Sequence, residues 1–166
     1  SEGLATDAHI RKVLHIVRTH LDMDVGFVSE FVDGRRVFRQ VDGDKAPVKV
    51  GDGDPLEESY CQRVVDGRLP EMIPDAGQNT EALTIPATTQ LPVGAHMSVP
   101  LRLPDGRVFG TFCCFSFMAN HSLNDRDAAA TIGLSRNTFL KYRDNKNPPL
   151  TVRLALAAIT QGLGPV

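Results

Sequence analysis

Residues 95–118, AHMSVPLRLPDGRVFGTFCCFSFM, decide the fold. Residues 95–103 read as a strand, Pro104-Asp105-Gly106 is a turn sequence, and residues 107–118 form a long run rich in Phe, Val, Thr and Cys. Because residues 108–117 are apolar at successive positions, they predict a strand buried on both of its faces. We therefore expect this hairpin at the centre of an antiparallel sheet.

A second hairpin and an opening helix precede it. Residues 25–32 and 35–41 have strand patterns, and the Asp33-Gly34 pair between them is a strong turn signal. Residues 4–21 place apolar side chains at helical spacing, which predicts an amphipathic helix. Helix, hairpin and central hairpin together favour an α+β fold.

The middle of the chain is less regular. Residues 42–53 are rich in Gly, Asp, Pro and Lys and predict a loop. Asp54 and Pro55 have the residue types of an N-cap and a first helical position, so we expect a helix to begin there and continue over residues 56–65. Residues 75–94, here called the crossover, mix Gly, Asn, Thr and Pro, and so long a loop usually serves function or is disordered.

Charge divides the chain into two parts. The net charge is −2, but residues 1–130 carry 13 basic and 19 acidic side chains, whereas residues 131–166 carry five basic and one acidic. We therefore expect a domain over residues 1–130 and a basic helical extension over residues 131–166, with a helix beginning at Asn124. The overall balance argues against a polyanion-binding surface along the whole chain.

The cysteine pattern and the apolar runs exclude several classes. Cys61, Cys113 and Cys114 form no CxxC pair and no cluster at metal-ligand spacing, so neither a disulfide framework nor a metal site is expected. Apolar runs fall far short of the roughly 20 residues that cross a bilayer. The pattern predicts a reduced, cytoplasmic protein without a membrane partner, and the missing initial Met predicts a fragment of a longer chain.

Four segments in this order resemble the GAF domain, the small-molecule sensor module of bacterial signalling proteins. They are DPLEESYCQRVVDGRLPEMIPD (residues 54–75), GAHMSVPL (94–101), DGRVFGTFCCFSF (105–117) and LNDRD (123–127). The resemblance covers about residues 4–130 and implies a central antiparallel β-sheet flanked by helices, with a pocket on one face under the crossover. It is most similar to GAF modules upstream of cyclic-di-nucleotide or histidine-kinase output domains.

The resemblance also implies a set of pocket residues. The candidates are Phe27, Ser29, Tyr60, Cys61, Ile73, His96, Ser98, Thr111 and Cys113. His96 and Ser98 share one face of their strand. Three interpretations stay open: this face is merely hydrated, His96 is a hydrogen-bonded histidine of the core, or the two residues line a pocket and fix a ligand. Tyr60 and Cys61 likewise either contact a ligand or only pack.

The positions of the cysteines bear on whether the chain holds a bilin and whether it is an enzyme. Photosensory GAF domains usually hold a bilin through a Cys in the crossover, and residues 75–94 contain none, so a covalent bilin is not expected and the cofactor stays unknown. Sulfoxide reductases of the family use several loop cysteines, whereas Cys113 and Cys114 lie within an apolar strand, where a thiol is usually unreactive. No nucleophile, base and oxyanion donor come together in the sequence, so no catalytic residue is assigned.

The basic extension admits two interpretations. Residues 128–162 resemble part of a lambda-repressor or Cro-like helix-turn-helix, in which Ser135, Arg136 and Asn137 would face bases and Lys141 and Arg143 would lie near phosphates. Alternatively, these residues supply the closing helix of the GAF domain and one further helix.

The function predicted from the sequence is a non-enzymatic sensor that binds a small ligand, dimerises through its terminal helices, or does both, and so regulates an output domain. The alternative is a ligand-responsive transcriptional regulator that binds DNA through residues 128–162. A GAF-type sulfoxide reductase that depends on Cys61 is a third interpretation.

Overall fold

The computed structural model describes residues 2–102 and 105–123, and the side chains of its first helix from Ile10 onward. Helix α1 (Glu2–His20) opens the chain, as the apolar spacing predicts. Within the described ranges, no helix is both long enough and apolar enough to cross a membrane. The predicted helix from Asn124 and the whole basic extension lie outside these residues.

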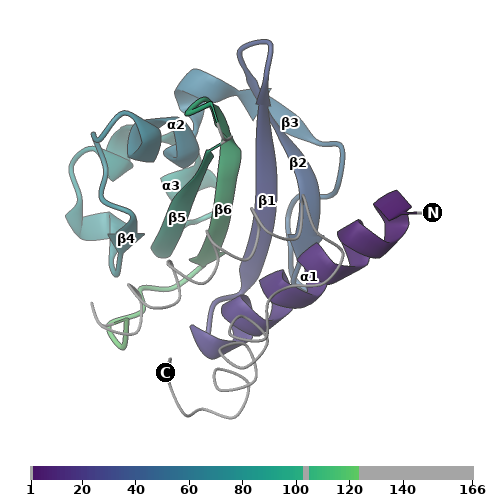
Figure 1. Ribbon diagram of the computed structural model, residues 1–166. Coiled ribbons are helices and arrows are strands. Elements are labelled where there is room, and N and C mark those ends of the chain that lie inside the picture. The colour runs from purple at the N-terminus through teal and green to yellow at the C-terminus, as the bar shows by residue number, and fades with distance from the viewer. Residues whose placement is uncertain (1, 103–104, 124–166) are drawn as a thin grey trace.

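Six antiparallel strands form one sheet in the order β3-β2-β1-β6-β5-β4 (Figure 1). They are β1 (Val25–Val32), β2 (Arg35–Asp42), β3 (Gly53–Pro55), β4 (Met72–Ile73), β5 (Ala95–Arg102) and β6 (Val108–Ser116). Both predicted hairpins are present, and β6 pairs with β5 on one side and with β1 on the other. The prediction of a central second hairpin is therefore confirmed.

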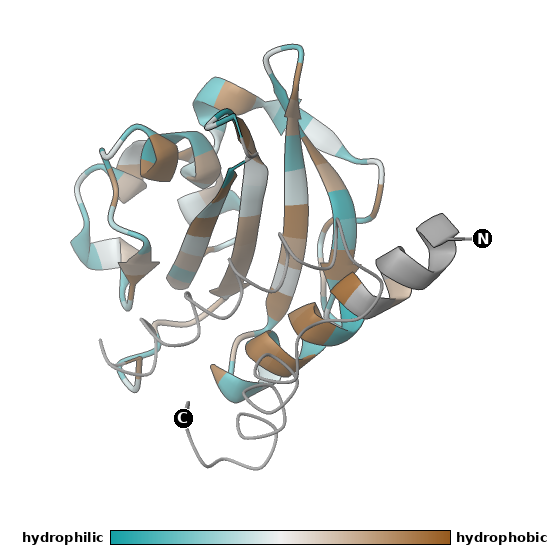
Figure 2. Ribbon diagram, viewed as in Figure 1, coloured by the Kyte–Doolittle hydropathy of each residue, from teal (hydrophilic) through white to brown (hydrophobic). Residues whose placement is uncertain are grey.

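Helix α1 covers one face of the sheet. Leu14 and Val17 of α1 are fully buried against alternate residues of the central strands, among them Met97 and Phe112. Figure 2 shows hydrophobic residues alternating with more hydrophilic ones along the strands, so that one set of side chains of each strand faces α1. The apolar stripe of α1 thus packs in the core of the domain and gives no argument for a dimer interface. Dimerisation through the terminal helices stays a prediction.

The second face carries a separate core. Helix α2 (Tyr60–Val65) and the crossover pack on this side, as Figure 1 shows. The crossover contains three short helices, η2 (Ala76–Gln78), η3 (Ala82–Thr84) and α3 (Pro86–Gln90). Phe27, Cys113 and Phe115 face them from the sheet. The two faces of β6 are therefore both buried, which confirms the prediction for this strand.

The start of the second helix was predicted wrongly. Asp54 and Pro55 belong to β3, which pairs with β2, and a short 3-10 helix η1 (Leu56–Glu58) follows. The N-cap of α2 is Ser59, whose Oγ accepts a hydrogen bond from the Gln62 backbone N–H at 3.1 Å. Strand pairing and an ion pair between Asp54 and Arg36 override the local preference of an Asp-Pro sequence for a helix start.

Gly110 permits the closest approach of the two central strands. A Cβ atom at this position would lie 1.8 Å from the backbone oxygen of Ser29 in β1. We expect Gly110→Ala to lower the free energy of unfolding by about 3 kcal/mol or more, because backbone atoms would have to move apart. Urea denaturation measures this change. Gly77→Ala is the control: its Cβ meets only the Asp75 carboxylate at 3.2 Å, and its cost should stay below about 1 kcal/mol.

Candidate functional site

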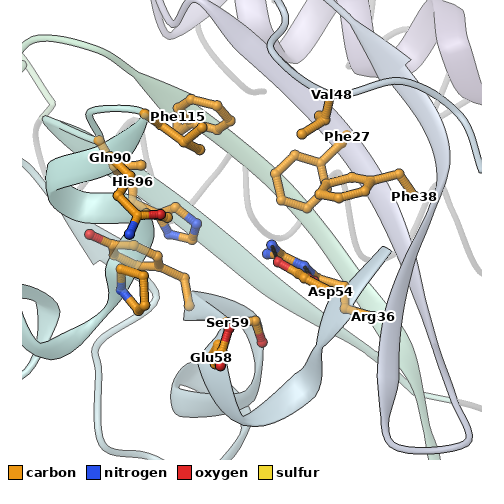
Figure 3. Close-up of a pocket in the computed structure, with 15 residues that line it drawn as sticks. Phe27, Arg36, Phe38, Val48, Asp54, Glu58, Ser59, Gln90, His96 and Phe115 are labelled. Atoms are coloured by element: carbon orange, nitrogen blue, oxygen red, sulfur yellow. Dashed lines mark hydrogen bonds and ion pairs between the residues drawn. The ribbon is translucent and has the colours of Figure 1, made fainter. Parts of the chain in front are cut away.

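A cavity of about 230 Å³ lies between the sheet and the elements that cover its second face. Strands β1, β2, β3, β5 and β6 supply its sheet side, and α2, α3 and the loops around them supply its rim. Figure 3 shows the side chains that line it: Phe27, Arg36, Phe38, Val48, Asp54, Glu58, Ser59, Tyr60, Pro86, Ala87, Gln90, Leu91, Val93, His96 and Phe115. The volume is below the roughly 300–1,000 Å³ of sites for drug-sized ligands, so it suits a molecule of one or two rings.

Aromatic side chains make much of the sheet side of the cavity. The Phe27 ring meets the edge of Phe38 at a centroid distance of 4.9 Å and that of Phe115 at 6.3 Å. All three are nearly fully buried. Such rings offer faces and edges for stacking against a planar ligand.

Arg36 places a permanent positive charge beside these rings. Its guanidinium pairs with Asp54 through two hydrogen bonds, one of them Nε to Oδ1 at 2.9 Å, and it lies 4.8 Å from the centre of the Phe38 ring and 5.5 Å from that of Phe27. Burial disfavours the charge, but the neighbouring Cys61 and Asp54 outweigh it and raise the pKa of Arg36 further. Figure 3 shows Arg36 and Asp54 together beneath the two rings.

His96 lies across the cavity from Arg36 (Figure 3). Its ring stacks on Tyr60 at a centroid distance of 4.3 Å, and Tyr60 donates its hydroxyl hydrogen bond to Thr88 of the crossover. The residue is 2% exposed, and among the described residues its Nδ1 is the one buried side-chain nitrogen or oxygen without a hydrogen-bond partner. Burial, and secondly the charge of Arg36, lower the pKa of His96 to about 3, so the ring is neutral at physiological pH.

The structure separates the nine predicted pocket residues into two groups. Phe27, Tyr60 and His96 line the cavity. The other six are buried behind its wall: Ser29, Cys61, Ile73, Ser98, Thr111 and Cys113. Most of this second group forms a hydrogen-bonded cluster on the same face of the sheet.

Most residues of the cavity wall were not predicted from the sequence. Arg36 and Phe38 alternate with exposed or half-buried neighbours along β2, so period-two patterning held the signal that both point inward. Asp54 becomes part of the wall only through its pairing with Arg36. Gln90 and Leu91 come from the crossover, where no periodicity indicates direction.

Metal and DNA sites have no support in the described part of the chain. There, no three His, Cys, Asp or Glu side chains are grouped to hold a metal ion. The alternative DNA-binding residues Ser135, Arg136, Asn137, Lys141 and Arg143 all lie outside the described residues.

An antiparallel sheet covered on both faces, with a small aromatic cavity under an irregular crossover, defines a domain of the α+β class. The GAF domain model matches residues 6–134, and the chain belongs to the GAF domain family. Members of this family are sensory modules of signalling proteins that bind small molecules or chromophores. A comparison with curated protein sequences gave no match.

Solved structures share the fold at low sequence identity. The GAF domain region of a Geobacter sulfurreducens PCA protein is 14% identical, with a TM-score of 0.67 over 86% of this chain and 95% of that one. The blue-light absorbing form of the Thermosynechococcus elongatus PixJ GAF domain is 18% identical, with a TM-score of 0.65 over 87% and 88%. A type II free methionine-R-sulfoxide reductase from Thermoplasma acidophilum is 13% identical, with a TM-score of 0.65 over 86% and 94%. The fold therefore occurs in both a light-absorbing protein and an enzyme.

The buried neutral His96 makes stability depend on pH. In the unfolded chain its pKa returns to about 6.5, against about 3 in the fold, so the unfolded state alone binds the proton between these values. Above about pH 6.5 His96 therefore costs the fold no stability by this route. As the pH falls from 6.5 towards 3, its effect lowers the free energy of unfolding progressively. We expect this residue to remove about 2 kcal/mol of unfolding free energy between pH 8 and pH 5.

The measurement is urea denaturation at several pH values, compared with His96→Phe. The variant keeps an aromatic ring beside Tyr60 and shares every carboxylate with the wild type, so the difference between the two pH profiles isolates His96. Arg36 and Tyr60, which also face the ring, have raised pKa values and do not titrate in this range. Parallel pH profiles would contradict the assignment of a buried neutral imidazole.

Proposed function

We propose that this domain is a non-enzymatic sensor that binds a small planar molecule in the cavity and regulates an output domain. The observation that carries the proposal is His96, a residue of the cavity wall whose buried Nδ1 has no hydrogen-bond partner. A buried polar atom without a partner costs about 1–3 kcal/mol, which a hydrogen bond from a ligand would recover.

The side chains of the cavity wall indicate the chemical class of the ligand. Arg36 and Asp54 neutralise each other, and His96 is neutral, so no strong net charge is left unpaired among these three groups. The Phe27 and Phe38 rings favour flat apolar faces. We therefore expect a heteroaromatic molecule of one or two rings with one polar edge group that faces His96.

Signal transmission follows from which elements would touch the ligand. Pro86, Ala87 and Gln90 come from the crossover, whereas Phe27 and Phe115 belong to the rigid central strands. A ligand shifts a conformational equilibrium only through its different affinity for two arrangements. We expect the crossover to be the part that moves, because it is the side of the cavity built from short helices and loops.

An enzymatic role is less well supported. Cys61 and Cys113 are both fully buried, and neither lines the cavity. A bound substrate would thus meet no thiol. The remaining wall offers a neutral imidazole, the Arg36–Asp54 ion pair, the Glu58 carboxylate, the Gln90 amide and hydroxyls. No hydrogen bond recorded among these described residues joins a nucleophile to a base.

Filling the cavity tests the proposal. Ala87 is half-buried in α3 and lines the cavity, whereas Thr89, two residues on, is exposed and does not. Ala87→Trp should weaken binding at least about tenfold, because the indole occupies the ligand's volume, and Thr89→Trp should leave binding unchanged. A panel of one- and two-ring heteroaromatic compounds is screened by thermal shift, and hits are titrated by calorimetry with each protein.

Native mass spectrometry of the purified wild type shows any molecule retained from the cell. The proposal fails if no panel member binds and no adduct is retained, or if Ala87→Trp binds a hit as tightly as Thr89→Trp.

A further inference from the structure

Two thiols meet behind the cavity wall. The Sγ atoms of Cys61 in α2 and Cys113 in β6 lie 3.5 Å apart, although 52 residues separate them in the chain. Both residues are fully buried, and both are free cysteines. Ligand binding as proposed above uses neither of them.

The surroundings of the pair differ on its two sides. Arg36 Nη1 donates to the Cys61 Sγ at 3.3 Å. The Cys113 Sγ instead lies 3.1 Å from the Ser98 hydroxyl and 3.2 Å from the Thr111 hydroxyl. A cation beside one thiol and neutral hydroxyls beside the other is the arrangement in which Cys61 carries the negative charge and Cys113 keeps its proton.

The pKa values of the two thiols differ in the same direction. Burial opposes ionisation of Cys61, but the facing thiol and the charge of Arg36 outweigh it and lower the pKa of Cys61 below the usual range. Burial and the neighbouring Cys61 raise the pKa of Cys113. A thiolate in contact with a thiol supplies both partners of disulfide formation, a nucleophile that reacts with an oxidant and a resolving thiol.

We propose that Cys61 and Cys113 form a reversible intramolecular disulfide when the domain meets hydrogen peroxide or a small alkyl hydroperoxide. The Cys61 thiolate attacks the peroxide, breaks the O–O bond and becomes a sulfenic acid, while the departing hydroxide or alkoxide takes up the proton that Cys61 had lost. Cys113 then attacks the Cys61 sulfur, the S–S bond forms, and its proton leaves with the hydroxyl group as water. Two thiols give up two electrons and two protons, and the peroxide is reduced to water or to water and an alcohol.

Arg36 lies between the cavity and this pair of thiols. Arg36 lines the cavity and also contacts Cys61, so we expect a molecule as small as hydrogen peroxide to reach the thiol where this side chain moves aside. Closing the bond brings the sulfurs from 3.5 Å to about 2 Å and draws α2 towards β6. Because Tyr60 of α2 lines the cavity, we expect the oxidised form to have an altered cavity shape.

Cys114 is a matched control within the same strand. It is as deeply buried as Cys113 but faces α1 on the opposite side of the sheet, within the apolar core. Burial raises the pKa of Cys114 to about 12, so it stays protonated. Its neighbourhood offers neither a thiolate nor a resolving thiol.

The experiment treats the folded full chain with equimolar hydrogen peroxide, blocks remaining thiols with an alkylating agent under denaturing conditions, and measures intact mass and peptide maps. We expect the wild type to lose two of its three alkylation sites and two hydrogens, with the peptides of Cys61 and Cys113 linked. Dithiothreitol should restore all three thiols, because the dithiol supplies two electrons and two protons. Cys114→Ala should behave as the wild type, and Cys61→Ala and Cys113→Ala should form no internal disulfide.

The wild-type peptide map decides the matter even if a variant fails to fold, and melting temperatures identify such a variant. Three unmodified thiols, a link that includes Cys114, a disulfide between two chains, or oxygen addition without a link would each overturn the proposal. The result is independent of the proposed ligand, because thiol oxidation is measured without one and cavity binding is measured in dithiothreitol.

Discussion

The structure depends on the burial of both faces of β6. This strand has neighbours on both sides and cores above and below, and it is buried from Gly110 to Ser116. Each side chain in this part is therefore assigned to one core or the other by the alternation of the backbone. Phe112 and Cys114 pack towards α1, and Cys113 and Phe115 pack towards the cavity side. A shift of one residue would exchange these sets, and the close contact of Gly110 with Ser29 helps to fix the register.

Regular patterns predicted the framework well for this reason. The two hairpins and α1 follow from period-two and period-3.6 spacing, and the placement of His96 on the face opposite Ala95 and Met97 follows from the same alternation. The burial of His96 is known only from the structure. The helix start at Asp54 was predicted wrongly, because its contact with Arg36 spans 18 residues and leaves no local signal. The crossover wall was missed for the same physical reason: its side-chain directions are set by tertiary contacts such as that of Tyr60 with Thr88.

Arg36 is the residue on which the chemistry of the second face converges. A buried guanidinium is tolerated only when its charge and its N–H groups are satisfied, and here Asp54, Cys61 and two aromatic rings share that task. The guanidinium thus lines the cavity and also contacts a thiol behind the cavity wall. Without Arg36, both the Asp54 carboxylate beside the cavity and the proposed Cys61 thiolate would lose the positive charge that compensates them.

Arg36 takes part in both proposals, so it couples ligand binding in the cavity to oxidation of the Cys61–Cys113 pair. When Cys61 enters a disulfide it loses the negative charge that Arg36 contacts, and the guanidinium then depends on Asp54 and the rings alone. A ligand that packs against Phe27 and Phe38 while Cys61 is a thiolate would meet a different balance of charge once the disulfide forms. Thermodynamic linkage makes the effect reciprocal, so a ligand that prefers the reduced form must also make the pair harder to oxidise.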